Sequence, residues 1–100
     1  MAAEIGITNC TVYNSTLSSG VKEVIIDTPT TADSDDYITL VLKNYGITTL
    51  KSIFGVVHTT DGSVIATEAP TTAVTTGTLV ITVTGSSVDD KRRVYTLRGV

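Results

Sequence analysis

The fold is decided by the stretch Gly77-Thr78-Leu79-Val80-Ile81-Thr82-Val83-Thr84-Gly85. Its odd-numbered positions between the two glycines carry Leu79, Ile81 and Val83, and its even-numbered positions are mostly threonine. This period of two predicts a strand with one face in a core and one half-polar face. Such a strand needs neighbours in a sheet, so the rest of the chain is expected to supply further strands.

The composition points to one small β-domain. The chain has 100 residues, of which 41% are hydrophobic and only 5% aromatic, with no tryptophan and one phenylalanine. A core must therefore be built from Val, Ile and Leu, and the abundant threonine also favours a pleated surface. We predict a single all-β domain over residues 1–100, an antiparallel sandwich or flattened barrel of about seven strands.

The same alternation recurs along the chain. It predicts further strands at Ile5–Tyr13, Val21–Thr28, Tyr37–Lys43, Leu50–Thr60 and Lys91–Arg98. The side chains expected to face the core in these strands are Ile5, Ile7, Val12, Val24, Ile26, Ile38, Leu40, Leu42, Tyr95 and Leu97.

Local signals refine this pattern. Asp61-Gly62 predicts a hairpin that returns through Ser63–Thr67. Thr28–Asp36 is expected to be a surface loop, and Glu68–Thr76 an extended edge or loop. Gly55, inside a strand, indicates a bulge or a close backbone approach.

Residues 53–57 read Ile-Phe-Gly-Val-Val and place apolar side chains on both faces of their strand. A strand of this kind is either central or covered by a partner. Because a short chain with such a strand leaves apolar surface exposed, we expect the isolated protein not to be a monomer.

Charge and cysteine content exclude several classes of function. The net charge is −3 and the sequence pI about 4.8, so phosphate-based nucleic-acid binding is not expected. Cys10 cannot form a disulfide within one chain and is expected to be a small buried residue.

The N-terminus lacks a signal-peptide pattern and no apolar run could cross a bilayer. We therefore expect a protein made in the cytoplasm, without membrane contact or cofactor.

Two groups of polar residues are candidates for a chemical site. His58 precedes Thr59, Thr60 and Asp61, but a catalytic triad would need these groups to converge in a pocket, and a solvated strand end is the favoured interpretation. Asp33, Asp35 and Asp36 offer oxygen ligands for Ca²⁺ but lack the glycine and distal glutamate of an EF-hand, so a solvated loop is favoured. No catalytic, cofactor or metal site is predicted, and the protein is not expected to be an enzyme.

The only basic cluster consists of Lys91, Arg92, Arg93 and Arg98. These residues are either solvated strand residues, balanced by Asp89 and Asp90, or the contact to an acidic surface of a partner. As surface charges, Arg92 and Arg93 could be reversed to glutamate with the fold expected to stay intact.

Four stretches carry a family resemblance: Asp27–Ile38, Ile53–Val57, Gly77–Gly85 and Asp90–Tyr95. Together they resemble the small Thr/Val-rich virion proteins encoded among the head genes of tailed bacteriophages and related viruses. The likeness covers most of the chain and lies in its Thr/Val-rich character rather than in one motif. It implies a capsid decoration or cement protein on the capsid exterior, bound to the major capsid protein lattice and to copies of itself as a dimer or trimer, without catalytic residues.

Two alternatives remain beside this one. Tail-tube subunits share this character but tend to be larger. A small carbohydrate- or ligand-binding β-module would use exposed aromatic rings as stacking platforms. The tyrosines available for that purpose are Tyr13, Tyr37, Tyr45 and Tyr95, of which Tyr95 is expected to be internal.

Overall fold

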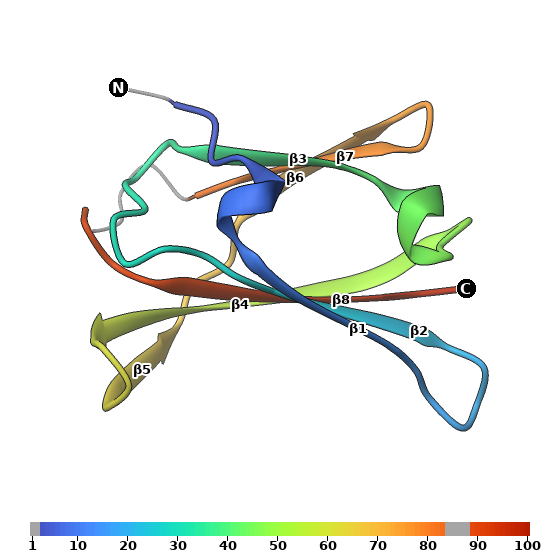
Figure 1. Ribbon diagram of the computed structural model, residues 1–100, viewed down its shortest axis with the longest axis horizontal. Helices are drawn as coiled ribbons and strands as arrows, with labels where there is room; N and C mark the ends of the chain where they lie inside the picture. The colour runs from blue at the N-terminus through green and yellow to red at the C-terminus, as the bar shows by residue number, and fades with distance from the viewer. Residues whose placement is uncertain (1–2, 84–88) are drawn as a thin grey trace.

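The computed structural model describes residues 3–83 and 89–100 and consists of two antiparallel β-sheets packed face to face (Figure 1). The larger sheet has the strand order β1-β2-β8-β4-β5 and the smaller one β3-β7-β6. The strands are β1 (Thr11–Thr16), β2 (Lys22–Asp27), β3 (Tyr37–Val41), β4 (Leu50–Thr60), β5 (Val64–Thr67), β6 (Thr71–Thr75), β7 (Thr78–Thr82) and β8 (Arg93–Gly99). The predicted all-β sandwich is confirmed.

The core lies between the two sheets. In the smaller sheet, Ile38 of β3 is paired with Ile81 of the central strand β7, and both are fully buried. Val24 and Ile26 of β2 and Tyr95 and Leu97 of β8 face them from the larger sheet. Burial of each such side chain stabilises the fold by about 1.5–3 kcal/mol. The predicted inward faces of these strands and of β7 are confirmed, while Thr84 and Gly85 lie outside the described residues.

The N-terminal prediction was wrong in its bounds. Instead of a strand at Ile5–Tyr13, residue 4 forms an isolated bridge to Tyr37, a short 3-10 helix η1 follows at Ile7–Asn9, and β1 begins only at Thr11. The backbone N–H of Ile5 donates to the carbonyl of Tyr37 at 2.7 Å, which carries the chain along the edge of the smaller sheet before it crosses to the larger one. β1 is an edge strand whose side chains are mostly exposed, so it shows no alternation.

The strand predicted at Tyr37–Lys43 is shorter than expected. It ends at Val41, and a second 3-10 helix, η2 (Leu42–Tyr45), follows and is closed by Gly46 in the left-handed conformation at φ 77°. Leu42 is nevertheless buried as predicted. Neither 3-10 helix, nor any other helix in residues 3–83 and 89–100, has the length and apolar character needed to cross a membrane.

Gly55 marks a close approach, as its position in β4 predicted. A Cβ atom at this position would lie 2.5 Å from the carbonyl oxygen of Glu68 and 3.0 Å from the ring of Tyr95. The irregularities of register in β4 occur elsewhere, between Leu50 and Ser52 and between His58 and Thr60. The missing side chain therefore lets the link between β5 and β6 approach the middle of β4.

Candidate protein-binding site

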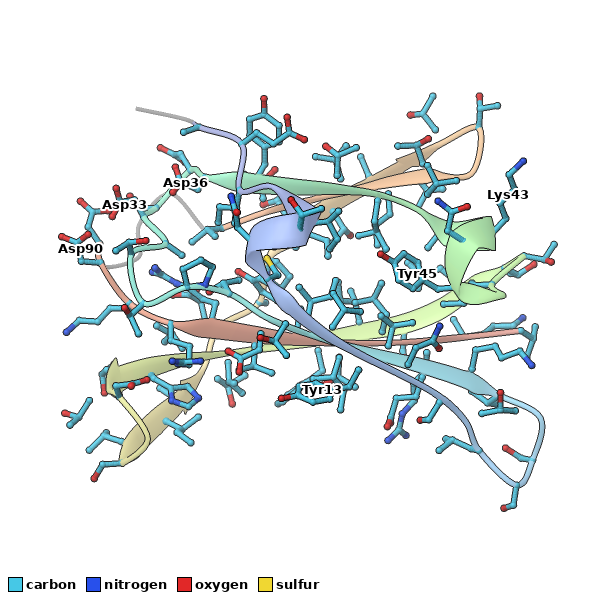
Figure 2. All side chains as sticks on the ribbon, in the orientation of Figure 1. Tyr13, Asp33, Asp36, Lys43, Tyr45 and Asp90 are labelled. Carbon is cyan, nitrogen blue, oxygen red and sulfur yellow. The ribbon has the colours of Figure 1, made fainter. Side chains whose placement is uncertain are left out.

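An apolar row crosses the outer face of the larger sheet, the face directed away from the smaller sheet. Strand register aligns Tyr13 with Ile25, Ile25 with Thr96, and Thr96 with Phe54, so the row runs over β1, β2, β8 and β4. Tyr13 is 57% exposed and Phe54 is 55% exposed. Figure 2 shows Tyr13 on this side of the sheet. We call Tyr13, Ile25, Thr96 and Phe54 the apolar row.

The surface next to the apolar row is slightly hollowed. A depression of about 310 Å³ is lined by Ser52, Phe54, Thr96 and Arg98. On the other side of the row, Val94 and Val56 form a second, half-buried apolar pair. The outer face therefore has an apolar centre with one shallow depression beside it.

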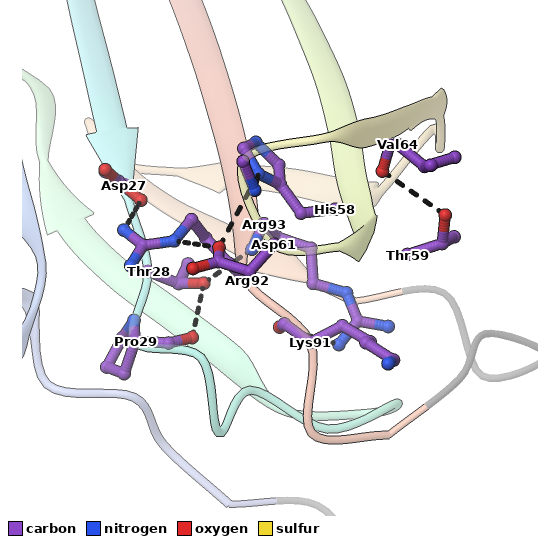
Figure 3. Close-up of polar contacts among 11 residues, drawn as sticks. Asp27, Thr28, Pro29, His58, Thr59, Asp61, Val64, Lys91, Arg92 and Arg93 are labelled. Atoms are coloured by element: carbon purple, nitrogen blue, oxygen red, sulfur yellow. Dashed lines mark hydrogen bonds and ion pairs between the residues drawn. The ribbon is translucent and has the colours of Figure 1, made fainter.

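Ion pairs border the apolar centre at both ends. At one end, Arg98 and Glu23 are paired across β8 and β2, with Nη2 2.9 Å from Oε2. At the other end, Arg92 bridges two carboxylates, with Nη1 2.9 Å from Asp27 Oδ1 and Nε 2.8 Å from Asp61 Oδ1 (Figure 3). The hydrogen bonds to Asp27 and then to Asp61 raise the pKa of Arg92. Both guanidinium groups are thus neutralised within the chain, and neither presents an unbalanced positive charge.

The assignment of Arg93 to a basic surface patch was wrong. Its side chain is 0% exposed, because residue 93 shares the inward face of β8 with Tyr95 and Leu97. The guanidinium forms an ion pair with Glu68, with Nε 3.2 Å from Oε1, and donates hydrogen bonds to the carbonyl oxygens of Ala32 and Lys91. Arg93 therefore cannot contact a partner, and reversing its charge is no longer expected to leave the fold intact.

Lys91 also contributes to the structure through its backbone. Its N–H donates to the carbonyl of Ala32 at 3.1 Å, and the residue is half-buried. Of the four residues predicted to bind a partner, Arg92 and Arg98 lie at the two ends of the outer face, Lys91 lies beside the loop at residue 32, and Arg93 is internal. The structure does not bring them together as one patch.

His58 holds the hairpin between β4 and β5. Its Nδ1 atom accepts a hydrogen bond from the backbone N–H of Gly62 at 3.1 Å and lies 3.7 Å from Asp61 Oδ1 (Figure 3). The side chain is only 13% exposed, so the expectation of a solvated strand end was wrong for the imidazole itself. Nδ1 accepts the hydrogen bond from Gly62, and the Asp61 carboxylate is paired with Arg92. His58 therefore stabilises the turn, and the arrangement differs from that of a general base and its orienting carboxylate.

In the loop that contains Asp33, Asp35 and Asp36, carboxylates accept hydrogen bonds from backbone N–H groups. Asp36 accepts hydrogen bonds from the backbone N–H groups of Ala3 and Asp33, and Asp33 accepts one from Asp90. Asp89 accepts from both the backbone N–H and the hydroxyl of Ser34, which lowers the pKa of Asp89. Within residues 3–83 and 89–100, no group of three or more His, Cys, Asp or Glu side chains is placed to hold a metal ion.

No family model matches the sequence, and neither a curated protein nor a solved structure gives a match. The function therefore has to follow from the chemistry of the outer face. An aromatic and aliphatic centre bordered by ion-paired polar residues fits the general anatomy of a protein-binding surface. The two-sided apolar pattern of residues 53–57 is the sequence signal for this face, although the participation of Tyr13 depends on strand register and could not be read from the pattern.

The remaining tyrosines do not join this surface. Tyr95 is fully buried, and Tyr37 and Tyr45 are half-buried on or beside the smaller sheet. Cys10 was expected to be buried; it is half-buried and packs against the edge of the core, and burial raises the pKa of its thiol.

Proposed function

We propose that this protein is a non-enzymatic structural component of a virus particle, a decoration or cement protein made in the host cytoplasm that binds the major capsid protein lattice on the capsid exterior. The observation that supports this proposal is the apolar row, in which two aromatic side chains stand more than half exposed on a sheet held rigid by the core beneath it. The resemblance of the sequence to small virion proteins supplies the class of partner.

The strength of such a contact can be bounded. An aromatic side chain buries 150–250 Å² when fully covered, so covering the exposed halves of Tyr13 and Phe54 contributes roughly 2–3 kcal/mol each. Association itself costs an estimated ~4–15 kcal/mol. One copy therefore binds weakly through this face, and stable attachment needs several linked copies that raise the effective concentration.

Co-sedimentation with the virus particle, or with a large assembly from the same source, tests the proposal. The double variant Tyr13→Ser/Phe54→Ser should remain folded by circular dichroism, because both side chains are largely outside the core, and should lose binding at least roughly ten-fold. The matched control is Val64→Ser, an equally exposed apolar residue of β5 outside the apolar row. Wild-type binding by the folded double variant would overturn the assignment of the outer face.

A second candidate function is a small carbohydrate- or ligand-binding module. It is favoured by the 310 Å³ depression, whose lining includes both the aromatic residue Phe54 and the charged residue Arg98. Titration of the labelled protein with a panel of mono- and oligosaccharides would shift the Phe54 and Thr96 amide signals if this function holds. Saturable shifts there, without sedimentation on particles, would replace the first proposal with the second.

A further inference from the structure

Strand β6 forms an open edge of the smaller sheet. It comes last in the strand order β3-β7-β6, and each of its five residues, Thr71-Thr72-Ala73-Val74-Thr75, is exposed. Its pairing with β7 is regular from Thr71 opposite Thr82 to Thr75 opposite Thr78. Among the residues that the structure describes, no segment is paired with the other side of β6.

The turn geometry shows which backbone groups of β6 are open. The hairpin from β6 to β7 turns through Thr76 and Gly77, whose φ angles of 50° and 77° are those of a type I′ turn. In such a two-residue hairpin the closing pair, Thr75 and Thr78, is hydrogen-bonded. Alternation along the strand then directs the N–H and C=O groups of Thr72 and Val74 away from β7.

The opposite edge of this sheet, β3, is partly covered by another segment of the chain. On β3, the backbone of Tyr37 is covered by the N-terminal segment, since Ile5 N–H donates to its carbonyl and its N–H donates to Ala3. Proteins usually protect open edges with charged residues, proline, bulges or a covering segment. β6 has no charged residue and no bulge. It also has no proline, since Pro70 lies just before the strand. Such an edge is suited to pairing with another strand.

We propose that β6 pairs antiparallel with β6 of a second copy of this chain, across a two-fold axis at Ala73. In this register Thr72 of each copy lies opposite Val74 of the other, so the outward N–H and C=O groups of both residues meet their partners. Ala73 lies opposite itself in a non-hydrogen-bonded pair, where side chains approach most closely and a small one fits. The two three-stranded sheets become one continuous six-stranded sheet.

The chemistry of β6 favours a second copy as the occupant. The whole chain carries a net charge of −3, which would oppose self-association over most of its surface, but β6 consists only of Thr, Ala and Val. A copy approaching through this edge therefore meets no like charge on the strand itself. The contact uses the smaller sheet and leaves the apolar row on the larger sheet free, so it does not depend on particle binding.

Charge variants at Ala73 test the proposed register. Ala73→Lys and Ala73→Glu each place like charges opposite each other at the axis, so each variant alone should dimerise at least roughly five-fold more weakly than the wild type. An equimolar mixture of the two should recover association, because lysine then faces glutamate. Sedimentation velocity over a concentration series at low salt measures this, with circular dichroism to verify folding.

Two further variants keep the test decisive. Val74→Pro removes an outward N–H that β7 does not use, so it should abolish dimerisation while the fold persists. Tyr13→Ser/Phe54→Ser should leave dimerisation unchanged. The proposal is overturned if the wild type stays monomeric at millimolar concentration. It is also overturned if either folded Ala73 variant associates like the wild type, or if the mixture of the two shows no recovery. Loss of association in the Tyr13/Phe54 variant would overturn it as well.

Discussion

The Nε atom of Arg93 lies 3.2 Å from Oε1 of Glu68, in an ion pair whose arginine has no exposed surface. Arg93 also donates to the carbonyls of Ala32 and Lys91, and its backbone N–H donates to the Thr28 hydroxyl at 2.8 Å. One side chain thus ties together the loop after β2, the segment before β8 and the link between β5 and β6.

Removal of one partner from this pair should be costly. We expect Arg93→Ala to lower the free energy of unfolding by about 3–5 kcal/mol, because the largely buried carboxylate of Glu68 loses the guanidinium and the carbonyls of Ala32 and Lys91 each lose a hydrogen-bond donor. The control is Arg98→Ala, which breaks the exposed pair with Glu23 and should cost less than about 1 kcal/mol. Urea denaturation followed by circular dichroism measures both. Similar losses in the two variants would show that burial does not set the strength of the Arg93 pair.

The two faces of β7 should respond differently to a charge. Ile81 is fully buried, so Ile81→Asp should prevent soluble folding, since an unpaired buried carboxylate costs several kcal/mol against a total stability of ~5–15 kcal/mol. Thr82 is half-buried and faces away from the core, so Thr82→Asp should change stability far less. Soluble yield and thermal unfolding compare the two, and equal damage would contradict the facing assigned to β7.

Tyr95 offers a stabilising substitution. Its hydroxyl is buried and, among the residues that the structure describes, accepts or donates no hydrogen bond. Burial raises the pKa of this phenol, with the negative charge of Glu68 adding to the effect. Tyr95→Phe should therefore keep or increase the free energy of unfolding, by up to about 1 kcal/mol, because it removes an unsatisfied polar group. A loss of more than about 1 kcal/mol in chemical denaturation would mean that the hydroxyl has a partner.

Asp89 should contribute to the acid sensitivity of the fold. Its pKa is lowered by the hydrogen bonds from Ser34, so it stabilises the folded state above the pKa that it has when unfolded, about 3.9. This stabilisation is lost as the pH falls through the lower folded pKa. The melting temperature of Asp89→Asn should thus fall less than that of the wild type between about pH 5 and pH 2. Parallel curves for the two proteins would contradict this role of Asp89.

The alternation of apolar residues predicted the sandwich well where strands are buried on one face. Val24 and Ile26, and likewise Tyr95 and Leu97, lie inward as expected. The bounds of β1 did not follow from alternation, because an exposed edge strand is held by backbone pairing and its side chains show no alternation. Alternation also failed to place Arg93, although the residue shares its parity with Tyr95 and Leu97, because an arginine was assumed to be solvated.

The candidate site was predictable only in part. The pattern of residues 53–57 indicated a second apolar face on β4, and Phe54 is exposed there. Tyr13 joins that face because β1, β2 and β8 are aligned in one particular register, which depends on contacts between distant segments. Charge neutralisation of Arg92 and Arg98 depends on the same long-range pairing and has no local signal.

The close approach at Gly55 also predicts a residue pattern by which distant relatives of this chain could be recognised. Four residues from three separate stretches of the chain meet at this point: Gly55 admits the Glu68 backbone, Glu68 pairs with Arg93, and the ring of Tyr95 covers Gly55. Surface threonines can be exchanged with little cost, whereas Gly55 and Arg93 cannot change singly and position 95 needs an aromatic ring. Distant relatives should therefore be recognisable by a glycine inside a long strand, an acidic residue after the following hairpin, and Arg-x-aromatic in the last strand.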